Sequence, residues 1–248
     1  MRRGYIRSTW DFGNTREVEE KHNGNYGAPG QGRKRKRNPT PEDIERQNQW
    51  RRERDLRHLI KWNFRKTDYW VTLTYRKGER PTWEQMARDV QDAIRKMRSR
   101  YKKKGQEMKY IYRLGIGKKG GPHIHILVNQ IPGTVSILQD SWSHGHINIR
   151  PMDDQDDCQA LSEYIAKPLE EYEPPKLKRY HPSRNLVRKE PEKKEIHQRT
   201  VVDKKGKMNK IIPPKGYYVN KASVRFGRNP VTGFFYRHYT LVKLDRRI

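Results

Sequence analysis

The alternation of hydrophobic and polar positions predicts a mixed α+β domain in the middle of the chain. Apolar and polar side chains alternate through residues 69–75, which is typical of a half-buried strand. Val71 and Leu73 fall on one face of this strand and should pack under helices. Thr72 and Thr74 fall on the opposite face. The same periodicities predict helices at 40–62, 82–103, within 132–144 and from Asp153 or Asp154 to about Tyr172, and strands at 108–117, 123–129 and 146–150.

The two ends of the chain differ from this middle part, residues 40–175. Residues 1–39 lack hydrophobic periodicity and are rich in glycine, asparagine and charge, so we interpret them as a disordered basic arm. Residues 176–248 are basic and contain several prolines, and they form a β-rich extension in this interpretation. The extension contains two possible hairpins, which pair 201–202 with 210–212 and 217–226 with 234–244.

The composition points to a polyanionic partner. The net charge is +27, and 34% of residues are charged against 32% hydrophobic, so nucleic acid is the first candidate. A membrane surface is the rival, but no long amphipathic helix with an aromatic face stands out. No run of 18 apolar residues and no signal peptide is visible, which fits a cytoplasmic protein. Cys158 is the only cysteine, which excludes an internal disulfide and a multi-cysteine zinc site.

The strand at 123–129 carries two histidines in alternate positions. His123 and His125 follow the entry Gly120-Gly121-Pro122. A strand places residues i and i+2 on the same face, so the two imidazoles should lie side by side, with apolar neighbours directed into the opposite layer. Paired imidazoles on a rigid strand favour a divalent-metal site. The alternative is a half-buried strand whose polar face happens to carry two histidines.

A tyrosine and a lysine follow in a helical pattern. Tyr164 and Lys167 stand three residues apart, which would place both on one helical face. The order of a strand, a His-x-His strand and a Tyr-x-x-Lys helix resembles the HUH endonucleases, and among them the single-tyrosine replication initiators of rolling-circle plasmids and small phages. The resemblance covers about residues 65–172. We therefore expect an α+β fold: a ferredoxin-like or RRM-like central antiparallel sheet with helices packed on it, a basic N-terminal arm and a β-rich C-terminal extension.

The resemblance implies a metal-dependent nicking and joining endonuclease. Tyr164 would attack a DNA phosphodiester, remain bonded to the 5′ side of the break and release a 3′ hydroxyl. His123 and His125 would hold Mg²⁺ or Mn²⁺, while Lys167 would neutralise charge at the phosphate. Members of this family usually take a third, acidic ligand from the preceding strand, but that place falls near Gly115, so the third ligand stays open.

The expected partners are single-stranded or hairpin origin DNA, with a host helicase and polymerase, and no membrane. A basic run at 33–37 should make sequence-independent phosphate contacts, although a solvated tail or a nuclear import tag has the same composition. The candidate nucleic-acid-binding residues are Arg33, Lys34, Arg35, Lys36, Arg37, Thr72, Thr74, Lys118, Lys119 and Arg184.

Several alternatives remain. An HUH transposase usually has glutamine near the tyrosine, and a relaxase has its tyrosine ahead of the histidines. A basic nucleic-acid-binding protein without catalysis would carry its histidines incidentally. A histidine-triad hydrolase needs a third alternating histidine, but residue 127 is leucine. His144 and His146 are spare ligands for which a structural or surface role is favoured, and Trp142 is expected to pack rather than to stack on bases.

Overall fold

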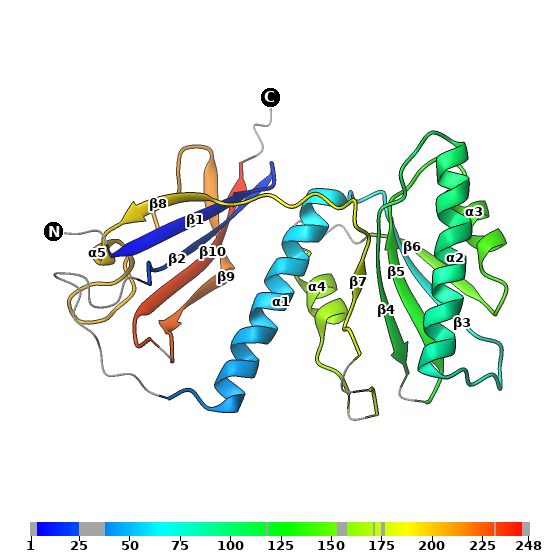
Figure 1. Ribbon diagram of the computed structural model, residues 1–248. Coiled ribbons are helices and arrows are strands. Elements are labelled where there is room, and N and C mark those ends of the chain that lie inside the picture. The colour runs from blue at the N-terminus through cyan, green and yellow to red at the C-terminus, as the bar shows by residue number, and fades with distance from the viewer. Residues whose placement is uncertain are drawn as a thin grey trace. The chain divides into compact units, whose positions relative to one another are not determined.

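The computed structural model describes residues 4–24, 38–117, 119–152, 158–170, 172–174, 177–230 and 232–244. The chain divides into two compact units. One unit is Gln49–Arg188, and the other joins Met1–Asn48 to Lys189–Ile248. Each unit contains a five-stranded antiparallel sheet within the described residues, so the expected α+β class is confirmed (Figure 1).

The sheet of the unit Gln49–Arg188 has the strand order β6-β3-β5-β4-β7. The elements β3, α2, β4, β5, α3 and β6 follow one another in the β-α-β-β-α-β order of the ferredoxin-like motif. The strands are β3 (Tyr69–Thr74), β4 (Tyr110–Ile116), β5 (Pro122–Val128), β6 (Ile147–Pro151) and β7 (His181–Pro182). The helices are α1 (Pro41–Asn63, of which the part from Gln49 belongs to this unit), α2 (Trp83–Lys103), α3 (Thr134–Ser141) and α4 (Gln159–Ala166).

One face of this sheet forms the larger hydrophobic core with α2 and α3. Val71 and Leu73 lie in this core as predicted, against the apolar stripe of α2. The side chain of Thr82 accepts a hydrogen bond from the backbone of Gln85 and caps the start of α2. Each fully buried aliphatic side chain contributes about 1.5–3 kcal/mol, so this face fixes the sheet and leaves the opposite face to the polar residues between.

The opposite face is covered by α1 and α4, which form a second core. Leu56 and Ile60 of α1 pack with Ile165 of α4 and with Leu127 of the sheet. The helix α1 begins where the sequence predicted, because the hydroxyl of Thr40 accepts a hydrogen bond from the backbone N–H of Asp43 at 3.2 Å. The packing places α4 directly over the strand that carries the two histidines.

The second unit contains the part of the N-terminal region that the structure describes. Its sheet has the order β8-β1-β2-β10-β9. The strands are β1 (Tyr5–Asp11), β2 (Thr15–His22), β8 (Glu192–Ile196), β9 (Tyr217–Arg228) and β10 (Phe235–Lys243), with the short helix α5 (Gln198–Val201). The predicted C-terminal hairpin over 217–244 is confirmed as β9 and β10. The other predicted hairpin is reduced to one bridge between Val202 and Met208.

The interpretation of residues 1–39 as a disordered arm was wrong where β1 and β2 form. The polar pattern of β2 conceals a strand because its buried charge is paired. Glu20 is buried and accepts hydrogen bonds from Arg7 of β1 at 2.7 Å and from Arg237 of β10 at 2.6 Å. A paired charge can be buried where a lone one cannot. The basic run Arg33–Arg37 lies outside the described residues.

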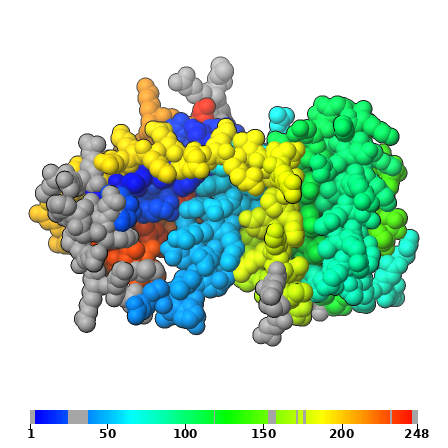
Figure 2. Space-filling model, in the orientation of Figure 1, coloured from blue at the N-terminus to red at the C-terminus, as the bar shows by residue number. Residues whose placement is uncertain are grey.

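The predicted boundary at residue 176 was also wrong. The described residues from 177 to 188 belong to the unit of the histidine strand. There β7 pairs with the edge strand β4 through His181 and Tyr112, and Figure 2 shows this yellow stretch against the green sheet unit. Among the helices that the structure describes, none is both long and apolar enough to cross a bilayer.

Candidate active site

The site lies on the sheet face beneath α4, where β3, β5 and β4 run side by side. The strand register aligns Thr72, His125 and Arg113 in one row across the sheet. The next row aligns Thr74, His123 and Gly115. The two imidazole ring centroids are 4.7 Å apart, so the prediction that the histidines share one face is confirmed.

The helix α4 brings Tyr164 to this pair. Its hydroxyl lies 2.6 Å from Nε2 of His125, and 44% of the residue is exposed. The burial of Ile165 and Ala166 against the sheet fixes the helix. Trp70 stacks on the His125 ring at 5.0 Å between centroids and meets the ring of Tyr164 edge-on at 6.1 Å. The expected approach of a phenol to the paired imidazoles is therefore found, with its oxygen accessible to a substrate.

Hydrogen bonds on the far side of each imidazole determine its orientation. Nδ1 of His123 lies 3.0 Å from the carbonyl oxygen of Gly121, which only accepts, so Nδ1 carries the proton. Nδ1 of His125 lies 3.1 Å from Oγ1 of Thr72, and its Nε2 accepts from the hydroxyl of Tyr164. These tautomers are assigned from the hydrogen-bond network. Both rings then present an Nε2 lone pair.

His125 is a neutral ligand rather than a proton acceptor. Burial, followed by the positive charges of His123, Arg113 and Lys167, lowers the pKa of His125 to about 3. An ordinary phenol has a pKa of about 10, so moving its proton to such an imidazole costs about 10 kcal/mol. His125 can orient the hydroxyl or bind a cation, but it is far too weak a base to deprotonate a phenol.

The residues fit a divalent cation held by two nitrogens. Histidines that bind metals usually donate their other ring N–H to a nearby oxygen, as His123 and His125 do to Gly121 and Thr72. Within the described part of the chain, no three His, Cys, Asp or Glu side chains group closely enough to hold a metal. The remaining ligands of a cation at this pair are thus left to water or to oxygens of a bound phosphate.

Gly115 explains why the preceding strand supplies no third ligand. It pairs with His123 across β4 and β5, and a Cβ at Gly115 would lie 2.9 Å from Nε2 of that histidine. The space that a carboxylate side chain would need is occupied by the imidazole itself. Glycine at this position is therefore a condition for the observed orientation of His123.

We expect Gly115→Ala to weaken Mn²⁺ binding at least roughly 10-fold, because the added methyl must displace the His123 ring. Isothermal titration calorimetry with Mn²⁺ measures the change. Gly121→Ala is the matched control, since a Cβ there meets no atom within 4 Å. Equal affinities for the two variants would contradict a role of His123 as a ligand.

Arg113 is a site residue that the sequence reasoning missed. Only 3% of it is exposed, and its Nη1 donates to the carbonyl oxygens of Ile165 at 3.0 Å and Lys167 at 2.9 Å. Its Nη2 lies 3.3 Å from a carboxylate oxygen of Glu173, and burial lowers the pKa of the guanidinium. Arg113 thus binds the carbonyls at the end of α4, just after Tyr164. Strand alternation on β4 was the signal that places it beside His125.

Lys167 does not share a helical face with Tyr164, contrary to the prediction. The helix α4 ends at Ala166, well before the predicted end near residue 172, and Lys167 is extended with φ −50 and ψ 150. Pro168 follows, and a proline disfavours the helical conformation in the residue before it. Nζ of Lys167 lies 3.0 Å from Oε1 of Glu170. The predicted start at Asp153 or Asp154 lies outside the described residues.

The other candidate residues fall into different places. The hydroxyl of Thr74 donates to the carbonyl oxygen of His146 at 3.1 Å. Lys119 and Arg184 are exposed, whereas Lys118 and the run Arg33–Arg37 lie outside the described residues. A DNA contact by any of these residues stays a prediction.

The aromatic residues near the opposite face of the sheet are structural. Trp142 is buried and donates through Nε1 to the carbonyl oxygen of Thr74 at 3.0 Å, which agrees with its expected packing role. His144 lies against Tyr75 and Trp142 rather than beside the histidine pair. The spare histidine at position 144 therefore belongs to the packing of the sheet.

Comparison with known proteins gives a family match over less than half of the chain. Residues 68–169 match the model of a family of replication-associated proteins, the ORF2 type. No curated protein and no solved structure matches the chain. The matched range begins at the start of β3 and ends just after α4, so it includes His123, His125 and Tyr164. The segment that builds the site is thus similar to replication-associated proteins.

Proposed function

We propose that the protein is a site-specific single-stranded DNA endonuclease and strand transferase that initiates rolling-circle replication. The observation that carries this proposal is the 2.6 Å approach of the Tyr164 hydroxyl to Nε2 of His125, beside His123. The similarity of residues 68–169 to replication-associated proteins supports it, and the net charge of +27 favours a nucleic-acid substrate.

The reaction is a transesterification with tyrosine as the nucleophile. The phenolic oxygen of Tyr164 bonds to the phosphorus of a DNA phosphodiester as the bond from phosphorus to the 3′ oxygen breaks. The phenolic proton is replaced by the phosphoryl group, and the released 3′ oxygen gains one proton, so no water is consumed. The tyrosyl phosphodiester keeps the energy of the original bond, and a later 3′ hydroxyl can therefore reverse the step.

The protein groups supply orientation and charge. His123 and His125 would hold Mg²⁺ or Mn²⁺, which when bound polarises a phosphate oxygen and favours attack on phosphorus. Thr72 and Gly121 keep the two imidazoles turned toward the substrate side. We assign Lys167 a supporting charge near the phosphate, because its ammonium lies close enough to contribute to the low pKa of His125.

The released 3′ end suggests the further partners. A free 3′ hydroxyl can prime a host polymerase, and continued synthesis needs a helicase to displace the strand. The basic residues Arg33–Arg37, Lys118, Lys119 and Arg184 would make salt-sensitive phosphate contacts to origin DNA, single-stranded or in a hairpin.

A denaturation-resistant protein–DNA adduct tests the proposal. The full chain is incubated with Mn²⁺ and end-labelled single-stranded oligonucleotides from any stem-loop flanking the gene, and the products are separated under denaturing conditions. We expect a labelled band at the mass of the protein and a shortened strand with a free 3′ hydroxyl. Binding without any adduct, across all such oligonucleotides, would favour a non-catalytic DNA-binding protein.

The geometry of His125 makes a separate prediction about the metal. Its Nε2 lone pair accepts the Tyr164 hydroxyl in this structure, and one lone pair cannot serve the hydroxyl and a cation together. Tyr164→Phe removes the competitor, so we expect it to bind Mn²⁺ roughly 2- to 10-fold more tightly, the range for loss of one hydrogen bond. Electron paramagnetic resonance of free Mn²⁺ measures this without DNA. Weaker binding by the variant would instead make the phenol a ligand.

A further inference from the structure

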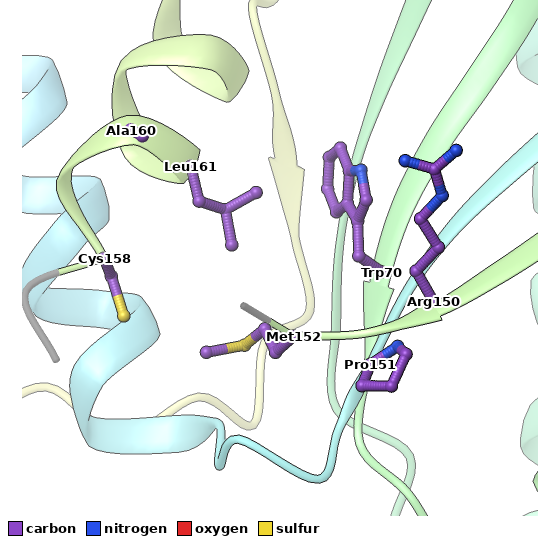
Figure 3. Close-up of a pocket in the computed structure, with 7 residues that line it drawn as sticks. All are labelled: Trp70, Arg150, Pro151, Met152, Cys158, Ala160 and Leu161. Carbon is purple, nitrogen blue, oxygen red and sulfur yellow. The ribbon is translucent and has the colours of Figure 1, made fainter. Parts of the chain in front are cut away.

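A pocket of about 420 Å³ lies beside the site, between the start of α4 and the strands β3 and β6. Figure 3 shows Leu161 of α4 and Trp70 of β3 on opposite sides of it, with Arg150 of β6 next to the indole. Met152 and Ala160 also line it. Its volume is within the range of small-ligand sites, about 300–1,000 Å³.

The pocket shares a wall with the paired imidazoles. Trp70, which lines the pocket, stacks on His125 at 5.0 Å with an interplanar angle of 9°. Leu161 lies one helical turn before Tyr164, and residues three apart on a helix are neighbours on its surface. A ligand seated between Trp70 and Leu161 is therefore within about one helical turn of the nucleophilic oxygen.

The chemistry of the pocket suits a planar, mostly apolar ring attached to an anion. An indole, a thioether and aliphatic side chains line it, and the Arg150 residue is exposed at its edge. Trp70 and Arg150 are cross-strand partners, so the guanidinium lies beside the ring. Aromatic side chains bind unpaired bases by stacking, with arginine adding attraction to the π system and the phosphate.

We propose that this pocket takes one unpaired nucleobase of the DNA strand, next to the phosphate held at Tyr164. The proposal rests on the proposed function and deepens it, because a seated base fixes which phosphodiester meets the nucleophile. It also gives the stacked pair Trp70–His125 a second role, since the indole both supports the imidazole and forms a wall of the base site.

Pocket-filling variants test the proposal in a binding assay without chemistry. The full chain carrying Tyr164→Phe is titrated with a fluorescent single-stranded thymidine oligomer and with an abasic oligomer of the same length. Adding Ala160→Phe should weaken binding of the thymidine oligomer by about 10-fold, the scale of one stacked base. Binding of the abasic oligomer should stay within about twofold. Ala160→Leu should give a smaller loss.

Ala222→Phe is the matched control, because it adds the same side chain at an exposed position of β9 in the other unit. It should change neither affinity, and thermal unfolding confirms that each variant is folded. Equal losses for both oligomers, or no loss for the thymidine oligomer, overturn the base pocket. Failure of the proposed function is seen separately, as the absence of any adduct in the unsubstituted chain.

Discussion

Tyr164→Phe is expected to abolish the covalent protein–DNA adduct while single-stranded DNA is still bound. The change removes only the phenolic oxygen, which is the nucleophile in the proposed reaction, and the retained ring can still meet Trp70 and His125 edge-on. Loss of a nucleophile removes the covalent pathway altogether, so we expect at least about a 1,000-fold fall in adduct formation. Labelled adduct is measured on denaturing gels, and binding is measured by fluorescence anisotropy.

Tyr172→Phe is the matched control for this experiment. Tyr172 is 55% exposed in the same unit, and its hydroxyl donates to the backbone carbonyl of Ile116 at 3.2 Å rather than to an imidazole. The same loss of one hydroxyl there should leave the adduct undiminished. An adduct that survives in Tyr164→Phe but is lost in Tyr172→Phe would mean that the chain uses the other tyrosine.

The local patterns of the sequence predicted much of the sheet and its chemistry. Alternation placed Val71 and Leu73 in the core. It also placed His123 and His125 together, because the side of a strand on which a residue lies depends only on odd or even position. The position opposite His123 was counted correctly to Gly115, since a short hairpin fixes the register of its strands.

Features that depend on distant residues were not predictable in this way. The strand β2 is held by β10, more than 200 residues later, where Arg237 pairs with Glu20. Without that partner the charged segment is typical of a solvated arm. Arg113 was missed for the same reason, because its roles depend on carbonyls and a carboxylate beyond α4. The early end of α4 was different: Pro168 was visible in the sequence, and its effect on Lys167 was given too little weight.

Arg113 connects the stability of the unit to the position of its nucleophile. Its buried guanidinium faces the carboxylate of Glu173, whose side chain is only 2% exposed, and it holds the last carbonyls of α4. Arg113→Ala leaves the carboxylate buried without this cation. We expect the free energy of unfolding to fall by about 3–5 kcal/mol, as is usual when one partner of a buried ion pair is removed. Denaturant titration measures it.

Arg95→Ala is the matched control for stability, since its pair with Asp92 is exposed on α2 and should contribute at most about 1 kcal/mol. The double variant Arg113→Leu with Glu173→Leu separates stability from positioning. Removing both charges should recover most of the stability, yet the carbonyls at the end of α4 still lack their donor. Adduct formation at saturating DNA should therefore stay roughly 100-fold low, as a misplacement of about 1 Å predicts. A stable double variant that forms the adduct at the original rate would limit Arg113 to neutralising Glu173, and would leave the orientation of Tyr164 to the packing of α4 alone.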